Sequence, residues 1–360
     1  MMRPVQAEGD GVLAITVRDL QFRARQFLIA VIGAGLVFAM TLLLAGMAAS
    51  FYTEITHTVH SVGVDAWVLP AGTSGPFTDV GAMPVTAVAT VAALPGVTAA
   101  GPIEVSPEAA QSGPHYLRVT MIGAPPGGLG SVAPARGHAI NANGEAVADT
   151  RAHAPIGGHL TIAGKTFTVV GLVSGLTLNG GSPDVWVTQQ DAQAVLFGDR
   201  ALVTGVVTRG VPTAAPSGDE VLTDAAVAHD TLRPMQSAVQ SVDNSREFMW
   251  VVAAVIVAAL VYVSSLQRVR DFAVLKAMGA SSFALFAGVA VQAVLVTMAA
   301  AVVAALSANL LKPLYPLPVA IPASAYLLLP VTAIVVGIAA SLVALRRAVS
   351  VDPALAFGAV

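Results

Sequence analysis

The stretch that decides the fold is Gln267-Arg-Val-Arg-Asp-Phe-Ala-Val-Leu-Lys-Ala-Met-Gly-Ala-Ser-Ser282, a short charged segment between two long apolar runs. The runs cover residues 248–266 and 283–311. Crossing the hydrocarbon core of a bilayer takes about 20 residues, so each run is long enough to span. A charged side chain at the bilayer centre costs roughly 2.5–3.5 kcal/mol. The segment between the runs is therefore expected to lie at one membrane face as a helix that joins two spans.

Composition identifies a membrane protein with a soluble insertion. Of the 360 residues, 55% are apolar and 11% are charged, where soluble domains carry about 25% charged residues. The mean hydropathy is +0.75. Four apolar runs reach spanning length, at residues 26–49, 248–266, 283–311 and 325–345. The first run is too long for the apolar part of a signal peptide, so we expect it to remain as a span.

Flanking charges predict the orientation. Eight Arg and Lys residues flank one set of span ends, and only Arg246 and Lys312 flank the other; the eight are Arg18, Arg23, Arg25, Arg268, Arg270, Lys276, Arg346 and Arg347. Positive residues are retained on the cytoplasmic side. Both termini are therefore predicted to be cytoplasmic, and the insertion is predicted to lie outside the cytoplasm. Three lysines stand against fifteen arginines, a balance typical of a GC-rich bacterial genome, so we expect the membrane to be that of a bacterial cell.

The predicted fold class is a membrane protein of four transmembrane helices with an inserted α+β extracytoplasmic domain. The expected order is a cytoplasmic interfacial helix (1–25), a first span (26–50), the α+β domain with helical stalks (51–246), a second span (247–267), a cytoplasmic coupling helix (268–281), a third span (282–311), an outer loop (312–324), a fourth span (325–345) and a cytoplasmic tail (346–360). Four prolines in residues 312–322 are expected to preclude a helix there.

Within the insertion, local patterns predict short strands and helices around a mixed sheet. The first stalk has no helix breaker before Gly63. Two alternating runs joined at Ala163-Gly164 predict a hairpin over residues 159–171. Further strands are expected at 64–69, 117–122 and 184–188, helices at 85–94, 189–197 and 224–246, and a loop at 210–219, with Gly123 closing the strand at 117–122.

Several kinds of chemistry are excluded or disfavoured by the residues. A net charge of −3 argues against a nucleic-acid partner, and the absence of cysteine excludes disulfides and thiol catalysis. Gly164-Lys165-Thr166 resembles the end of a phosphate-binding loop but lacks its first glycine and lies between strands. His57 and His60 have a metal-compatible spacing without an identifiable third ligand, so no metal or catalytic residue is predicted. No cofactor is expected in this chain, and any ATP and Mg²⁺ must bind a partner.

The segment between the second and third spans has the pattern of a coupling helix. Phe272 and Leu275 begin an apolar stripe, and Gly279 is a natural helix stop. The charged side chains lie mostly off that stripe; they are Arg268, Arg270, Asp271 and Lys276. These seven residues are our candidates for contact with a soluble cytoplasmic partner that supplies the energy. A simple cytoplasmic loop is the alternative interpretation of the same pattern.

Arg270-Asp-Phe-Ala-Val-Leu-Lys-Ala-Met-Gly-Ala-Ser281 resembles the signature of FtsX-like (MacB-type) ABC transporter permeases, compact four-span members included. Val351-Asp-Pro-Ala-Leu355 is similar to that family's closing motif, and residues 137–171 look like its extracytoplasmic core domain. Asp271 stands where glutamate is common, and the tail lacks an arginine after Leu355.

The resemblance implies a permease subunit that converts the motion of a cytoplasmic ABC ATPase into motion of the outer domain, for export or extrusion. It also implies a second permease copy, most simply as a homodimer, surrounding membrane lipid and a possible extracytoplasmic partner. Two alternatives stay open: an FtsX-like signalling regulator of a cell-wall hydrolase, and an importer permease for small solutes such as amino acids. The spans carry no ionisable residue near their centres, which disfavours ion-coupled transport.

Overall fold

A computed structural model describes residues 24–73, 75–198, 200–267, 274, 281–315 and 318–348. The chain divides into two compact units. The helical unit comprises residues 1–49 and 241–360, and the inserted unit comprises residues 50–240. Each unit is described separately below.

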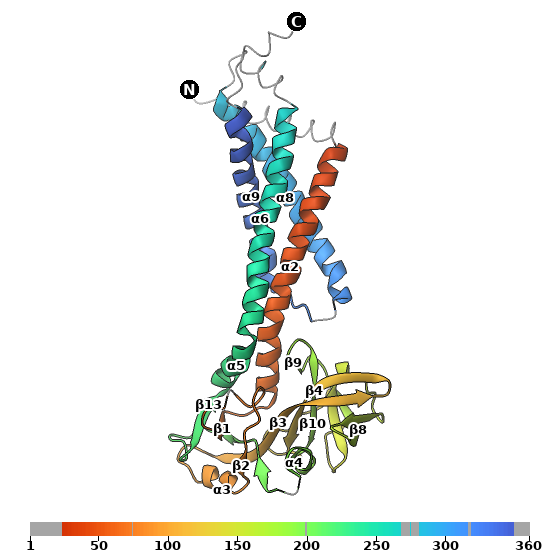
Figure 1. The fold of residues 1–360 in the computed structure, drawn as a ribbon, viewed down its shortest axis with the longest axis vertical. Coiled ribbons are helices and arrows are strands. Elements are labelled where there is room, and N and C mark those ends of the chain that lie inside the picture. Colours follow the sequence, from red (N-terminus) through yellow and green to blue (C-terminus); the bar gives the residue numbers. More distant parts are fainter. Residues whose placement is uncertain are drawn as a thin grey trace, which may run out of the picture. The chain divides into compact units, whose positions relative to one another are not determined.

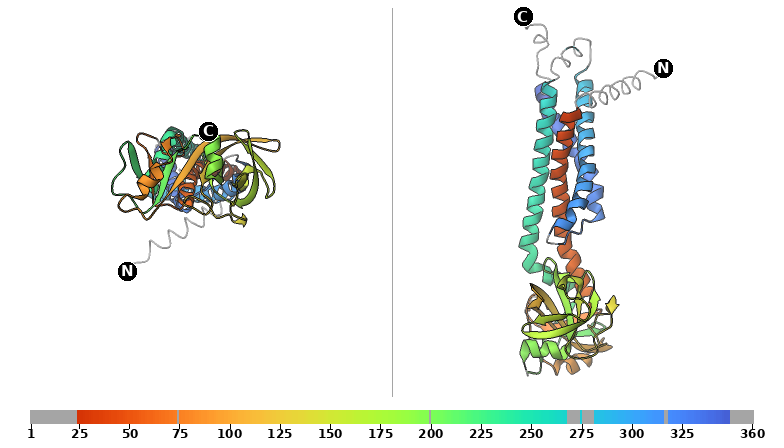
Figure 2. Two further views of the ribbon diagram at one scale, coloured as in Figure 1. Left: turned by 90° about the horizontal axis from the view of Figure 1, so that it is seen from below. Right: turned by 90° about the vertical axis from the view of Figure 1, so that its right-hand side faces the viewer.

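Four long helices build the helical unit: α2 (Ala24–Ser61), α6 (Gln236–Leu266), α8 (Ser282–Leu311) and α9 (Ala323–Ala348). In the described part of the chain, four segments are long and apolar enough to cross a membrane: Phe27–Ser61, Asp224–Ser264, Ala287–Leu314 and Ala323–Leu342. The helices form one bundle in Figure 1 and in the right-hand view of Figure 2. Leu310 and Leu327 remain 77% and 75% exposed, as suits side chains that face lipid.

Small residues let these helices approach closely. A Cβ atom on Gly35 would lie 2.8 Å from Cγ1 of Val303, so α2 and α8 pack with almost no space at this position. A Cβ on Gly337 would lie 2.9 Å from Oγ1 of Thr297, which brings α9 equally close to α8. Between apolar helices in lipid, packing of this kind takes the place of a hydrophobic driving force.

Polar groups within the helical unit are paired with one another. Gln292 on α8 donates from Nε2 to Oγ of Ser264 on α6, at 3.3 Å. The hydroxyl of Tyr326 on α9 donates to Oδ1 of Asn309 on α8, at 3.1 Å. Each bond joins two helices, so these polar side chains stabilise the packing of the helices.

The inserted unit is built around a mixed β-sheet, as predicted. Its strands are β1 (Ala66–Pro70), β2 (Met83–Pro84), β3 (Ala99–Ser112), β4 (His115–Ala124), β5 (Arg136–Gly137), β6 (Glu145–Asp149), β7 (His159–Ile162), β8 (Lys165–Val173), β9 (Thr177–Leu178), β10 (Ser182–Thr188), β11 (Leu202–Val203), β12 (Gly205–Arg209) and β13 (Asp219–Thr223). The sheet order is β13-β1-β12-β3-β4-β10-β6-β8-β5, and β2 pairs separately with β11. The pairs β4–β10 and β6–β8 are parallel.

Six of these strands close on themselves. The pairing runs β3–β4–β10–β6–β8 and returns to β3 through β7, which pairs with both β8 and β3. Alternate residues fill one side of this closed circuit, among them the fully buried Leu160, Phe167 and Val185. The other side chains, such as Trp186 on β10, join a second core. This is the inward and outward alternation of a small barrel.

Short helices complete the inserted unit: α3 (Ala87–Ala92), α4 (Gln189–Phe197), α5 (Asp224–Leu232) and the 3-10 turns η1 (Thr150–Ala152) and η2 (Arg233–Met235). The predicted hairpin is confirmed, since Ile162 pairs with Lys165 across Ala163 and Gly164. Both turn residues have positive φ, 48° and 86°, as a two-residue type I′ turn requires. Helix α4 has the predicted bounds and is capped by Oγ1 of Thr188.

Three local predictions were wrong. Gly123 does not close its strand, because β4 continues to Ala124; a Cβ there would lie 2.3 Å from Cβ of Ala192, so glycine is needed to let α4 pack. The helix expected over residues 224–246 is interrupted at η2, where Pro234 lacks the N–H for a helical bond. Proline did not preclude helix entirely in the outer loop, where η3 (Lys312–Leu314) accommodates it in a first turn.

Candidate functional site

The predicted ATPase-contacting residues lie outside the described part of the chain. They are Arg268, Arg270, Asp271, Phe272, Leu275, Lys276 and Gly279. Within this segment the structure describes Val274, which is helical and 48% exposed. Contact between this segment and an ATPase therefore stays a prediction. The predicted interfacial helix over residues 1–25 is described only from residue 24 onward, and the tail only as far as residue 348.

The end of helix α2 supplies the best-defined polar site in the inserted unit. The helix contains no proline and ends two residues before Gly63, whose φ of +67° is a left-handed conformation. Ile55, Val59 and Val62 recur on one face and are almost completely buried in the core that also holds Trp186. Glu54 and Thr58 lie beside that apolar stripe and are also buried.

Glu54 holds the turn between β9 and β10. Its Oε2 accepts hydrogen bonds from the backbone N–H groups of Gly180 and Gly181, at 3.1 and 3.2 Å. Both glycines have positive φ, 79° and 96°, which allows two successive N–H groups to point at one oxygen. Oε1 of Glu54 is buried and has no hydrogen-bond partner among the described residues.

One turn further along α2, Thr58 contacts Asp184 on β10. Oγ1 of Thr58 lies 2.5 Å from Oδ2 of Asp184 and 3.3 Å from the carbonyl oxygen of Thr177. Asp184 is completely buried. Desolvation raises the pKa of Asp184 to about 8, and the nearby Asp149 and Glu54 carboxyl groups add to the rise. The hydrogen bond from Thr58 and the nearby hydroxyl of Thr120 oppose it.

Asp149 completes this polar cluster from the end of β6. Its Oδ2 accepts from the backbone N–H of Leu176 at 3.0 Å, and its Oδ1 from that of Arg151 at 2.9 Å. We refer to Glu54, Thr58, Asp149, Thr177 and Asp184 as the α2 anchor. No three His, Cys, Asp or Glu residues in the described ranges are arranged to hold a metal ion. The hydrogen bonds of the α2 anchor join helix α2 to β9, to β10 and to the turn between these strands, and Asp149 lies beside that joint.

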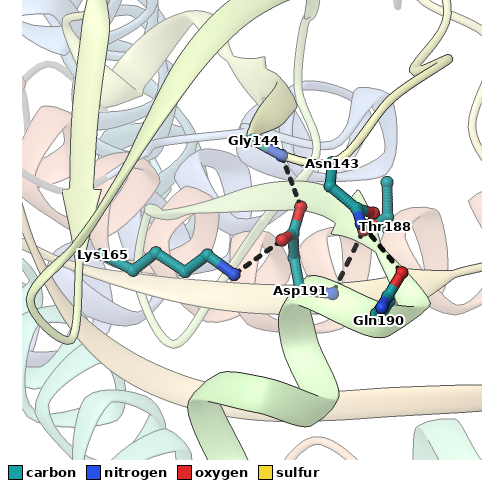
Figure 3. Close-up of polar contacts among 6 residues, drawn as sticks. All are labelled: Asn143, Gly144, Lys165, Thr188, Gln190 and Asp191. Atoms are coloured by element: carbon teal, nitrogen blue, oxygen red, sulfur yellow. Dashed lines mark hydrogen bonds and ion pairs between the residues drawn. The ribbon is translucent and has the colours of Figure 1, made fainter.

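Figure 3 shows the polar contacts of Lys165. Its Nζ lies 2.6 Å from Oδ1 of Asp191, whose other oxygen accepts from the N–H of Gly144 at 2.7 Å. Thr188 caps the same helix turn and donates to Oδ1 of Asn143. Lys165 thus joins the β7–β8 hairpin to α4.

A small cavity lies on the side of β10 that carries Trp186. Its volume is about 210 Å³, and Pro125, Pro126 and Ile140 are among its lining residues. Binding pockets for drug-sized ligands measure about 300–1,000 Å³, so this cavity is too small for such a ligand. Trp186 also lines it and donates from Nε1 to the carbonyl of Gly130 at 3.2 Å.

Two family profiles match the chain. The MacB-like periplasmic core domain matches residues 27–254, and the FtsX-like permease C-terminal domain matches residues 247–353. The chain belongs to the MacB/FtsX-type ABC transporter permeases. The predicted family and the predicted fold class are thereby confirmed.

Relatives of similar length support this assignment. An ABC transporter permease of Mycobacterium tuberculosis (strain ATCC 25618 / H37Rv) is 38% identical over 349 residues, which cover 96% of this permease and 99% of the relative. A second permease of that strain is 38% identical over 347 residues, with the same coverage.

Among solved structures, the periplasmic region of MacB from Actinobacillus actinomycetemcomitans matches with a TM-score of 0.35 and 10% identity, covering 50% of this permease and 98% of that chain. The extracellular domain of the ABC-type transporter YknZ from Gram-positive bacteria matches with a TM-score of 0.31 and 12% identity, covering 42% and 84%.

Sequence reasoning did not identify the α2 anchor. Glu54 and Thr58 are one turn apart, and each precedes a residue of the apolar face, Ile55 and Val59, by a single position. That spacing could have indicated a buried polar stripe. Asp184 gave no such signal, because an aspartate at the start of an alternating strand is normally exposed.

Proposed function

We propose that this permease transmits ATP-driven motion from a cytoplasmic ATPase subunit to the inserted unit, which lies outside the cytoplasm, and that the work serves export or extrusion. In this proposal both termini are cytoplasmic and the chain lies in the bacterial cell membrane. ATP and Mg²⁺ bind the partner subunit, and two copies of the permease act together, most simply as a homodimer. Hydrolysis is then performed by the partner and not by this chain.

The observation that carries the proposal is the continuity of α2. It is one helix of 38 residues, and its described residues include both an apolar spanning segment and the α2 anchor. A continuous helix transmits displacement along its axis, because its backbone hydrogen bonds leave no hinge. The last two turns are fixed to the β9–β10 turn by Glu54 and to β10 by Thr58.

The polar groups of the helical unit favour transmission of motion over a solute path. Gln292 and Asn309 are each used in bonds between helices. A path for a polar solute needs side chains that face water or the solute. Helix α8 contains no charged residue, and α9 contains none before Arg346. Lys312 lies just after the end of α8.

We propose that the ATPase contacts the permease through residues 268–280. Arg268, Arg270, Asp271 and Lys276 are proposed to contact the partner, while Phe272 and Leu275 seat the helix and Gly279 sets the turn into α8. A charged residue in the apolar stripe would unseat the helix without preventing membrane insertion, because the segment already carries charge.

The decisive experiment compares Phe272→Asp with Val274→Asp in vesicles that contain the permease and its ATPase. Phe272 belongs to the apolar stripe, whereas Val274 lies off it and is 48% exposed. Stimulation of the ATPase by the permease should fall at least tenfold for Phe272→Asp and stay within twofold for Val274→Asp. Gly279→Pro should act like Phe272→Asp. Equal stimulation by all the variants would contradict the proposal.

A further inference from the structure

We propose that Asp184 is held as the neutral acid, that it donates its proton to Oγ1 of Thr58, and that loss of this proton releases the end of helix α2 from β10. The α2 anchor is then a proton-sensitive latch. The consequence for transport rests on the proposed function, but the latch itself is a property of the inserted unit.

The first step is a count of hydrogens. A threonine hydroxyl has one hydrogen to donate, and two acceptors are within reach of Thr58. These are Oδ2 of Asp184 at 2.5 Å and the carbonyl oxygen of Thr177 at 3.3 Å. Thr58 can satisfy the carbonyl only if Asp184 supplies the hydrogen between the two side chains. The neutral acid thus forms a continuous chain from Asp184 through Thr58 to Thr177.

The second step is the state of the other carboxyl oxygen. A short separation such as 2.5 Å also fits a charge-assisted bond to a carboxylate, so distance alone does not decide between the two forms. Oδ1 of Asp184 is buried with no hydrogen-bond partner in the part of the chain that the structure describes. A carboxylate would place charge on that unpartnered oxygen, whereas the neutral acid leaves only a carbonyl there.

The third step is the charge around Asp184. Glu54 faces it from α2, and Asp149 faces it from the end of β6. Arg151, on η1, acts on Glu54 and is mostly exposed. The hydroxyls of Thr58 and Thr120 stabilise the ionised form, but desolvation outweighs them. Ionisation would therefore put a negative charge next to two further carboxyl groups inside the core.

The release follows from these three steps. When the proton passes to water, Thr58 must turn its hydrogen toward Oδ2, and the carbonyl of Thr177 loses that donor. Relief of the buried charge requires water to reach Oδ1. Water can reach Oδ1 only if an element packed on Asp184 moves away, and that element is α2, because β10 is held on both sides by β4 and β6. Opening therefore requires that hydration of the buried charge outweigh the bond from Thr58 to the carboxylate.

The test measures the distance between α2 and the sheet in the full-length protein. The chain has no cysteine, so Thr56→Cys and Arg118→Cys place two nitroxide labels uniquely, on exposed sites of α2 and β4. Pulsed electron paramagnetic resonance then records their distance distribution from pH 6 to pH 9.5. We expect one distance at pH 6 and loss of most of that population at higher pH, with a midpoint near pH 8.

Two further variants, made in the labelled protein, decide the assignment. Asp184→Asn keeps a donor toward Thr58 but cannot ionise, so it should keep the pH 6 distance throughout. Glu104→Gln is the matched control: Glu104 is another buried carboxyl group with a pKa raised to about 8, but it accepts its hydrogen bond from Gln189 on α4 and not from α2. This control should retain the pH response of the labelled protein.

Three results would overturn the latch: no change in distance up to pH 9.5, an unchanged response in Asp184→Asn, or loss of the response in Glu104→Gln. If Asp184→Asn fails to fold, Thr58→Val replaces it, and the released distance should then already be populated at pH 6. A closed distance in Thr58→Val with an unchanged midpoint would equally refute the proposal. Since no ATPase is present, none of these results depends on the proposed coupling to ATP.

Discussion

Buried acids in this permease differ in what faces them rather than in how deeply they lie. Asp191 and Glu104 are both shielded from water. Asp191 receives Lys165 and the N–H of Gly144, so its charge is matched on both oxygens. Glu104 receives only Gln189, at 3.3 Å, and its Oε2 has no partner among the residues described. Residue type alone therefore could not predict which buried carboxyl group lacks a partner for its charge.

Replacing Glu104 by Gln should stabilise the protein at high pH. Burial raises the pKa of Glu104 from 4.5 to about 8, so the folded state binds the proton more tightly than the unfolded state does. Stability from this group is complete below pH 4.5 and is lost as the pH rises toward 8. Thermal unfolding in detergent should show little difference at pH 4.5 and a gain of about 2–5 kcal/mol at pH 9. A gain that is equal at both pH values would contradict this reasoning.

The Lys165–Asp191 pair should respond asymmetrically to substitution. Asp191→Ala leaves the half-buried N–H of Gly144 and the ammonium of Lys165 without their acceptor, at a cost of about 1–3 kcal/mol. The side chain of Lys165 is 39% exposed, so Lys165→Ala should cost less than about 1 kcal/mol. Chemical denaturation of each variant gives both values. A larger loss for the lysine variant would show that the ion pair, and not the bond to Gly144, carries the energy.

Elements were predictable where a short stretch of sequence determines them. The hairpin over residues 159–171 has alternating side chains and a two-residue turn, and helix α4 has a threonine cap and a glycine stop. Strand β3 was missed because Pro102 and Pro107 argue against a strand. At Pro102, β3 pairs only with β12, and at Pro107 only with β4. The missing N–H can then point to the unpaired side, a condition that only the tertiary pairing creates.

Glycine positions within α2 offer a test of how its helix packs. A Cβ on Gly35 would lie 2.8 Å from Val303, whereas a Cβ on Gly33 would meet nothing within 4 Å. Gly35→Ala should therefore destabilise the helical unit by about 1–3 kcal/mol. Gly33→Ala should be neutral or stabilising by up to about 1 kcal/mol, because alanine favours helix. Unfolding temperatures in detergent compare the two. Effects of the same sign would mean that α2 and α8 are not in this contact.

For the whole molecule, the fold class, the family and the presence of four spanning helices followed from apolar run length and motif. The α2 anchor did not, because it joins residues more than 120 positions apart in the sequence. Such a joint is specified by the strand order, which places β10 between β4 and β6. The function proposed above depends on this joint as much as on the predicted cytoplasmic helix.

A break in α2 should separate ATP hydrolysis from transport. Two glycines inserted after Ser50 would introduce flexibility between the apolar segment and the α2 anchor. Transport in reconstituted vesicles should fall more than tenfold while ATP hydrolysis continues. The same insertion after Thr213, in the loop between β12 and β13, serves as the control and should leave transport within twofold. Full transport by the Ser50 insertion would exclude a rigid α2 as the transmitting element.

The closed circuit of six strands has a mechanical consequence. Asp184 lies on β10, whose neighbours on both sides belong to the ring. A force applied at Asp184 cannot separate the strands one at a time from an edge strand, because the closed ring has no edge strand. Either many hydrogen bonds of the ring break at the same time, or the ring moves as a rigid body. Force applied by the helix would thus displace the domain intact instead of unravelling it.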